Sequence, residues 1–279
     1  MKWLIIQSAG QHNGSDGWTP NDYLRECFAL QHALQQNGEI CDVWGLRHSN
    51  FKEEIDFNSY DNIVLLENYE WDWVPDLTKI TAKKYHWIID LHCQKNEIYA
   101  KYTRQCDVVL HSTKARIDGY KKLCPDQEHI WFANAVDDRY FNYEITPKTN
   151  NAVFLCSPFP ARIQFCKRIG APHKFAVGVD MFKAIRETKI NINNSLSNDV
   201  NYRNFETIGL GTCLLTNYLP ELETLGFKHG HNCLMYKNPQ DARKLLNHYL
   251  NCDRYVDIAK EGLALAKVHS YTERAKLII

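Results

Sequence analysis

Two oppositely charged side chains stand three residues apart in the stretch NDVNYRNFETIGLGTCLLTN, which covers residues 198–217. On a helix, Arg203 and Glu206 would share one face and could form a plain surface ion pair. They could also bind a ligand, because a carboxylate accepts hydrogen bonds from both hydroxyls of a vicinal diol and a guanidinium offers phosphate a fork of donors. Gly209 and Gly211 would let the chain turn sharply into the next strand. The stretch is therefore a candidate site for a nucleoside diphosphate, and a surface ion pair is the alternative.

The start of the same predicted helix, near residues 199–201, has two further features that suit a diphosphate. The first N–H groups of a helix have no partner within it, and its dipole is positive at that end, which makes Asn201 a binding candidate. Arg162 and Lys167 lie in a predicted helix after the first strand of the second half and could also contact the diphosphate. Either cation could equally be an exposed helix charge.

The first half offers candidates for binding and for proton transfer. The loop GQHNGSDGW, at residues 10–18, follows the first predicted strand, and Gly14 would allow the backbone to approach a ligand closely. The segment IIDLHC places Asp90 and His92 at the end of an inner strand. If the reaction needs a general base, Asp16, Asp90 and His92 are the candidates. The loop could instead be plain surface, and His92 could be a structural residue.

Apolar runs of strand length alternate with helical stretches along the whole chain, which predicts parallel-sheet α/β domains. Strands are predicted at residues 2–9, 40–46, 62–68, 85–93, 107–113, 129–136, 152–158, 174–180, 189–195, 212–217 and 233–237. Helices are predicted from about residues 20–21 to Gln36 and over residues 161–169, 239–250 and 254–270. The alternation restarts after residues 143–151, so we expect two Rossmann-like domains, 1–147 and 148–279.

Composition indicates an ordinary globular protein. Hydrophobic residues make up 44% of the 279 positions and charged residues 24%. The net charge is zero, but residues 1–100 carry eight Lys/Arg against fifteen Asp/Glu, so an anionic ligand is expected with the second half. No apolar run approaches the roughly 18 residues of a membrane span. The ten cysteines form no CxxC pair and are expected to be reduced, which favours the cytoplasm, or the host cytoplasm if the protein is viral.

Three segments carry a resemblance to a known family. The stretch from NYRNFETIGLGTCLLTNYLPELE to HSYTERAKLI resembles the C-terminal domain of CgeB-like (spore-maturation-protein-like) glycosyltransferases, which are relatives of glycosyltransferase family four. VFLCSPFPARIQFCKRI resembles the opening strand and helix of that domain, and IWFANAVDDRYF resembles the segment that closes the preceding one. The resemblance covers residues 128–279. It implies the GT-B fold, with two Rossmann-like domains facing across a cleft and a last helix that packs back toward the first domain.

The resemblance also implies roles for individual residues. Glu206 matches the family glutamate that binds the nucleoside sugar ring. Family four has another glutamate eight positions earlier, facing the donor sugar, and Asn198 stands at that position here. This departure leaves open which sugar is transferred, and whether its configuration is retained or inverted.

We therefore expect a glycosyltransferase, a hexosyl- or pentosyltransferase that uses a nucleoside diphosphate sugar, with a UDP-sugar as the first choice. It would need neither a bound cofactor nor a metal ion, and it would be a monomer or a weak dimer. His229, His231 and Cys233 have the alternation of zinc ligands on one strand face, but in the family this position is a turn. The alternative is a nucleotide-sugar-binding or structural protein of the same fold without transferase activity.

The acceptor is open between a glycan, a surface polymer and a hydroxymethylated base of phage DNA. A duplex DNA acceptor would require a basic face on the first domain. The residues that could form such a face are Lys83, Lys84, Lys114, Arg116, Lys121 and Lys122.

Overall fold

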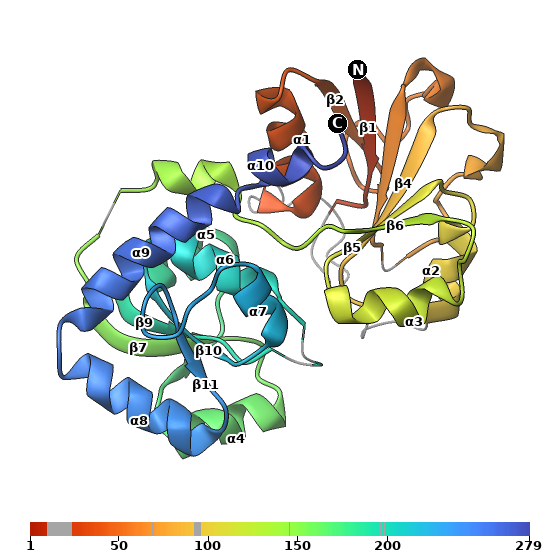
Figure 1. The fold of residues 1–279 in the computed structure, drawn as a ribbon. Coiled ribbons are helices and arrows are strands. Elements are labelled where there is room, and N and C mark those ends of the chain that lie inside the picture. The colour runs from red at the N-terminus through yellow and green to blue at the C-terminus, as the bar shows by residue number, and fades with distance from the viewer. Residues whose placement is uncertain (10–23, 69, 92–95, 145, 196, 198) are drawn as a thin grey trace. The chain divides into compact units, whose positions relative to one another are not determined.

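The computed structural model describes residues 1–9, 24–68, 70–91, 96–144, 146–195, 197 and 199–279. The chain forms two compact units, the first made of Met1–Ala133 with Tyr271–Ile279 and the second of Asn134–Ser270 (Figure 1). The sequence places the domain boundary at 147/148, and that boundary stays a prediction. Among the described residues, no helix combines the length and the apolar character needed to cross a bilayer.

The first unit is built on a six-stranded sheet with the strand order β2-β1-β3-β4-β5-β6, in which all neighbouring strands are parallel. Its strands are β1 (Lys2–Ile6), β2 (Ile40–Trp44), β3 (Asn62–Leu66), β4 (Lys83–Ile88), β5 (Val108–His111) and β6 (Glu128–Trp131). Every residue of β3 is buried, because both faces of the sheet are covered. The helices are α1 (Glu26–Gln36), α2 (Asn96–Thr103), α3 (Ile117–Lys121) and α10 (Tyr271–Ala275), with 3-10 turns at Phe57–Ser59, Leu77–Lys79 and Lys114–Arg116.

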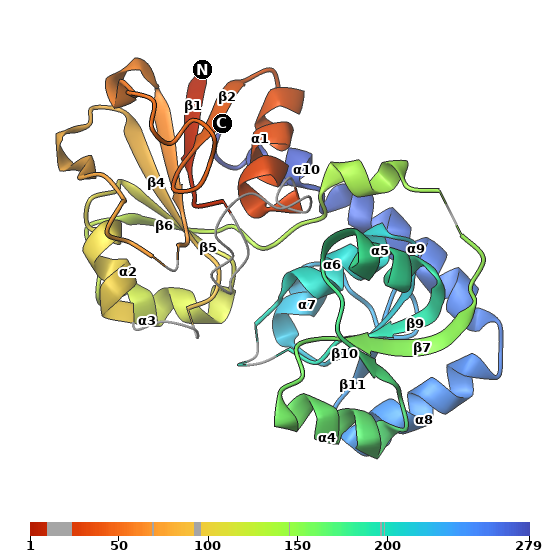
Figure 2. The same cartoon turned by 180° about the vertical axis from the view of Figure 1, so that it is seen from behind.

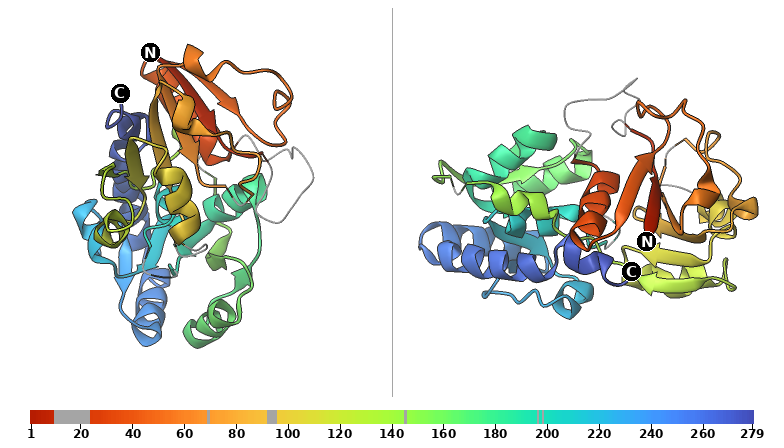
Figure 3. Two further views of the ribbon diagram at one scale, coloured as in Figure 1. Left: turned by 90° about the vertical axis from the view of Figure 1, so that its right-hand side faces the viewer. Right: turned by 90° about the horizontal axis from the view of Figure 1, so that it is seen from above.

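The C-terminal segment belongs to this first unit, although the whole second unit precedes it in the chain. Helix α10 packs against α1 (Figure 3). Asn37, which ends α1, donates a hydrogen bond from Nδ2 to the Thr272 carbonyl at 2.9 Å. The ring of Tyr271 meets the Trp87 indole at 5.7 Å between ring centroids. These contacts hold the end of the chain on the first sheet.

The second unit has a five-stranded parallel sheet in the order β11-β10-β9-β7-β8 (Figure 2). Its strands are β7 (Asn150–Leu155), β8 (His173–Lys174), β9 (Thr188–Ile192), β10 (Cys213–Asn217) and β11 (Leu234–Tyr236). Its helices are α4 (Pro160–Ile169), α5 (Gly178–Arg186), α6 (Tyr202–Gly209), α7 (Pro220–Thr224), α8 (Pro239–Leu250) and α9 (Arg254–Val268), and a 3-10 turn covers Asp138–Asn142.

The two sheets share one topology. If the strands of each unit are numbered separately, both orders begin 2-1-3-4-5, and the first sheet adds a sixth strand. In this arrangement the chain reverses its direction of travel across the sheet between the first and third strands, here β1 and β3 or β7 and β9. Ligands of open parallel sheets bind beyond the carboxyl ends of the strands at such a reversal point. The topology therefore defines one edge in each unit where site residues are expected.

The predicted strand over residues 174–180 is wrong. Strand β8 is only His173–Lys174, and α5 begins at Gly178. The error has a physical cause, because Phe175, Val177 and Val179 alternate as in a half-buried strand but are 56%, 38% and 45% exposed.

Candidate functional site

A network of buried amides fixes the loop between β9 and α6 in the second unit. Nδ2 of Asn193, which is 3% exposed, lies 3.0 Å from Oδ1 of Asn204 and 3.1 Å from Oδ1 of Asn201. The Ser195 N–H donates to Oδ1 of Asn217 at the end of β10, at 2.8 Å. These bonds tie the start of α6 to the carboxyl edge of the sheet. Of this network, sequence reasoning had found only Asn201. The sequence signal that could have identified Asn193 is its position directly after the buried strand β9.

The start of α6 agrees with the prediction of a helix beginning near residues 199–201. Asn201 is the N-cap residue, but its side chain makes no capping hydrogen bond, because it belongs to the amide network. The Asn201 side chain therefore does not cap α6, whose first turn is the positive end of the helix dipole.

Arg203 and Glu206 lie together on α6, as the spacing predicted. Nε of Arg203 is 3.5 Å from Oε2 of Glu206, and the two side chains are 17% and 15% exposed. Nη1 of Arg203 is buried and has no hydrogen-bond partner within the described chain. An N–H donor left in this state costs free energy until a ligand supplies an acceptor.

Arg162 reaches the same edge from α4, the helix that follows β7. Its Nε is also buried and finds no acceptor in the described structure, while its guanidinium lies 5.5 Å from the Phe159 ring. Burial raises the pKa of the Cys156 thiol, just beyond β7, and the positive charges of Arg162 and Arg203 oppose this rise. The positive charges of Arg162 and Arg203 therefore both influence Cys156, which lies at the reversal between β7 and β9. Two cations, each with a donor that finds no acceptor among the described residues, are the groups that binding of an anion requires.

Other predicted binding residues are placed differently. Lys167 is exposed in the last turn of α4, whereas Arg162 is in the first turn. Gly211 has a φ of +67° and makes the predicted turn into β10. Gly209 is helical, and a Cβ atom there would lie 2.5 Å from Cγ1 of Val136, so close packing requires this glycine. The predicted residues outside the described part of the chain are Gly14, Asp16, His92 and Asn198.

In the first unit, Asp90 lies beside a second acidic residue that sequence reasoning missed, Glu67. Glu67 is 6% exposed, and its Oε2 accepts the N–H groups of Ile89 at 2.9 Å and Asp90 at 2.6 Å. Burial raises the pKa of the Glu67 carboxyl, and the negative charge of Asp90 raises it further. An acidic residue directly after the buried β3 was the available signal.

The basic residues considered for a DNA acceptor do not form one face. Lys83 begins β4, whereas Lys114 and Arg116 follow the carboxyl end of the parallel neighbour β5. These cations therefore lie at opposite ends of the sheet. The Lys84 ammonium donates hydrogen bonds to the backbone carbonyls of Ile80 and Ala82, so this charge is engaged within the first unit.

The residues considered as zinc ligands are engaged in backbone contacts. His229 Nδ1 accepts the Met235 N–H at 2.9 Å, and His229 and Cys233 form an isolated β-bridge. Over the residues that the structure describes, no group of three or more His, Cys, Asp or Glu side chains could hold a metal ion.

Comparison with known structures identifies the fold. The structure is similar to HepE of Anabaena in complex with UDP and glucose, with 12% identity, a TM-score of 0.66, and coverage of 100% of this chain and 98% of that one. It is similar to T4 phage β-glucosyltransferase (14% identity, TM-score 0.65, coverage 99% and 96%). It is also similar to an α-glucosyltransferase in complex with UDP and a 13-mer DNA (9%, 0.61, 97% and 95%). The fold is GT-B.

Within this GT-B fold, residues 156–279 match the family model described as "Glycosyl transferase-like". The match covers Arg162, Arg203 and Glu206. No curated protein matches the chain in sequence. The matched segment spans most of the second unit and the C-terminal segment that belongs to the first.

Proposed function

We propose that this protein is a glycosyltransferase that moves a sugar from a nucleoside diphosphate sugar to a hydroxyl group of an acceptor. One observation carries the proposal: Arg162 and Arg203, at the starts of α4 and α6, each hold a buried N–H donor that has no partner among the described residues. A UDP-sugar is the first donor to test, because HepE was solved with UDP and glucose. The finer assignment to the CgeB-like group is part of this proposal.

In the proposed complex, each part of the donor meets a different group. Arg162, Arg203 and the start of α6 bind the diphosphate, and Glu206 accepts hydrogen bonds from the ribose hydroxyls. Negative charge grows on the diphosphate as the sugar leaves, so the same cations stabilise the transition state more than the bound substrate. Asn198 and Gly14 remain candidates for contacts with the donor.

The proposed general base is Asp90, at the carboxyl end of β4. Glu67 acts as a positioning residue, because its carboxylate holds the N–H groups of Ile89 and Asp90. A base here would accept the acceptor hydroxyl proton as the new glycosidic bond forms. Asp16 and His92 remain alternative bases.

The nine cysteines of the described part are free, and seven of them are buried. This state favours a reducing compartment, so we place the protein in the cytoplasm. We further propose that it acts as a monomer or a weak dimer.

Glu206→Gln tests the donor site, because the change removes the charge and keeps the shape of the side chain. Wild-type protein is first titrated with UDP, GDP and ADP by calorimetry and thermal shift, since a bound nucleotide raises the unfolding temperature by mass action. For the nucleotide that binds, Glu206→Gln should lose about 1.5–3 kcal/mol of binding free energy, the range for hydrogen bonds to charged groups.

Glu261→Gln is the matched control, because it makes the same chemical change at an exposed position on α9. Failure of folded wild-type protein to bind any of the three nucleotides would refute the proposed function. Equal affinity of wild type and Glu206→Gln would remove only the ribose assignment. Release of UDP from a UDP-sugar in the presence of acceptor then separates a transferase from a protein that only binds nucleotide sugars.

A further inference from the structure

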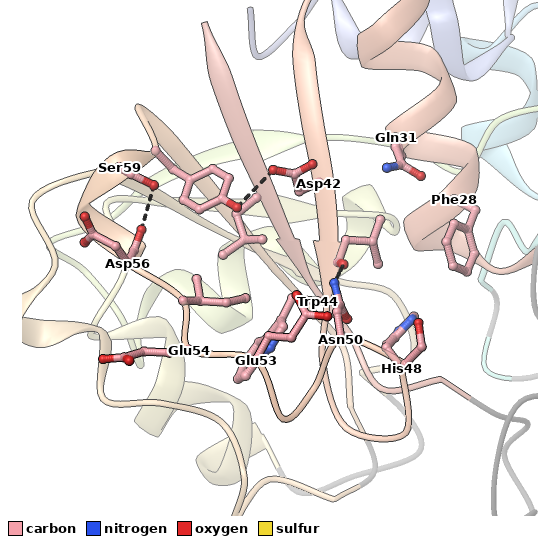
Figure 4. A pocket seen from close by; sticks show the side chains of 15 residues that line it. Phe28, Gln31, Asp42, Trp44, His48, Asn50, Glu53, Glu54, Asp56 and Ser59 are labelled. Carbon is pink, nitrogen blue, oxygen red and sulfur yellow. Dashed lines mark hydrogen bonds between the residues drawn. The ribbon is translucent and has the colours of Figure 1, made fainter.

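The first unit contains a pocket of about 880 Å³ beside the edge strand β2, lined by residues of β2, α1 and the segment 48–60 (Figure 4). It is distinct from the Glu67–Asp90 pair, since neither of these two residues lines it. The outward carbonyls of the edge strand are already occupied, because Gln31 Nε2 donates to Cys41 O at 2.8 Å and Asn50 Nδ2 donates to Val43 O at 2.9 Å. The pocket therefore suits a ligand that binds to side chains rather than an added strand.

The charged side chains of the pocket are all acidic. The lining includes four carboxylates and no Lys or Arg, namely Asp42, Glu53, Glu54 and Asp56. Two of these carboxylates have structural partners. The Tyr60 hydroxyl donates to Asp42 Oδ2 at 2.9 Å (Figure 4). The Asn58 N–H donates to Asp56 Oδ1 at 3.0 Å.

Glu53 and Glu54 are different, because both are exposed and neither makes a side-chain hydrogen bond or ion pair with the described residues. Lys52 precedes them in the chain but does not line the pocket. Two adjacent carboxylates without a cation partner are available to a positively charged ligand.

A second observation concerns two residues that line the pocket and carry a buried polar atom without a partner in the described structure. The Trp44 side chain lines it and is 8% exposed, and its indole Nε1 is buried with no acceptor in the described part of the protein. The Asn50 amide also lines it, and its Oδ1 likewise has no donor there. Such atoms are rare in native structures, because each leaves a hydrogen bond unmade. Hydroxyl groups can satisfy both atoms, since a hydroxyl donates to Asn50 Oδ1 and accepts from Trp44 Nε1.

We propose that this pocket binds a saccharide that carries a free amino group, and that it holds part of the acceptor of the transferase. The ammonium group pairs with Glu53 and Glu54, and the ring hydroxyls bond to Trp44 and Asn50. The same four carboxylates repel a phosphodiester backbone, so this pocket disfavours nucleic acid. The acceptor role rests on the proposed glycosyltransferase function, whereas the binding itself does not.

Calorimetry with two trisaccharides tests the proposal. At low ionic strength, the trimer of glucosamine should bind wild-type protein at least 10-fold more tightly than the neutral trimer of N-acetylglucosamine. The double variant E53Q/E54Q should remove most of this preference, and the two exposed positions leave the fold intact. The matched control is Glu128→Gln, which removes an exposed charge at the start of β6 in the same unit and should keep the preference. Trp44→Phe removes the indole N–H and keeps an aromatic ring, so it should weaken both trimers.

Equal binding of the two trimers, no binding of either, or an unchanged preference in E53Q/E54Q would overturn the proposal. Competition by a DNA duplex for the same pocket would also overturn it. The donor site is tested separately with UDP on wild-type protein. Binding of UDP without the glucosamine trimer refutes only this inference, and binding of the trimer without UDP refutes only the proposed function.

Discussion

Replacing Arg162 by alanine should weaken UDP binding about 10- to 150-fold, because a hydrogen bond to a charged group contributes about 1.5–3 kcal/mol and each 1.4 kcal/mol is a factor of ten. The buried Nε of Arg162 makes no hydrogen bond to the described residues. The change therefore removes no hydrogen bond between Arg162 Nε and the described residues. Without ligand, the unfolding temperature of the variant should stay close to that of wild type. Arg162→Lys should fall between the two, since it keeps the charge and loses the fork of donors.

Lys167→Ala is the control on the same helix. Lys167 is five positions further along α4 and exposed, so its backbone lies about 7.5 Å further along the helix axis. Solvent and salt screen a charge at that place, and the dissociation constant should change less than about twofold at 0.15 M ionic strength. Calorimetric titration with UDP measures both variants. If Lys167→Ala costs as much affinity as Arg162→Ala, or if Arg162→Ala binds like wild type, the anion site is wrongly placed.

Three further predictions concern catalysis and stability. Asp90→Asn should abolish sugar transfer and leave UDP affinity unchanged, and a variant that transfers at the wild-type rate would exclude Asp90 as the base. Transfer should persist in EDTA, because the two arginines supply the positive charge on the diphosphate, and loss of activity that Mg²⁺ or Mn²⁺ restores would contradict this. Burial lowers the pKa of His86 and of His111 from 6.5 to about 3, so between these values the unfolded chain binds protons that the folded protein does not. Stability should fall as the pH drops through this window, because the two histidines together contribute about 2.7 kcal/mol per pH unit and the raised pKa of Glu67 opposes only part of this change. Urea unfolding at pH 7, 6 and 5 measures the change, and constant stability would refute it.

The strands were predictable from sequence because a strand buried on both faces is a continuous apolar run. Strand β3 is a clear case, with five buried residues in a row. The pairing of strands was not predictable, since such runs do not specify their neighbours. The fold therefore came from the resemblance of residues 128–279 to GT-B enzymes, and the structure confirms it.

The part of the site that lies on one helix was predictable, because the residue types and their spacing together indicate a shared face. Arg203 and Glu206 share a face of α6 because residues three apart on a helix always do. The proximity of Arg162 to Arg203 was not predictable from their spacing in the sequence. It depends on two helices, α4 and α6, that begin at the same edge of the sheet. Glu67 was missed for a similar reason: its role appears only when β3 and β4 are neighbours, which places its carboxylate on the backbone of Asp90.

A crystal structure of the protein with UDP would test the central claim most directly. The account predicts diphosphate oxygens within hydrogen-bond distance of Arg162 Nε and Arg203 Nη1, and ribose hydroxyls on the carboxylate of Glu206. A nucleotide bound at another place, with Arg162 Nε and Arg203 Nη1 still lacking an acceptor, would contradict it.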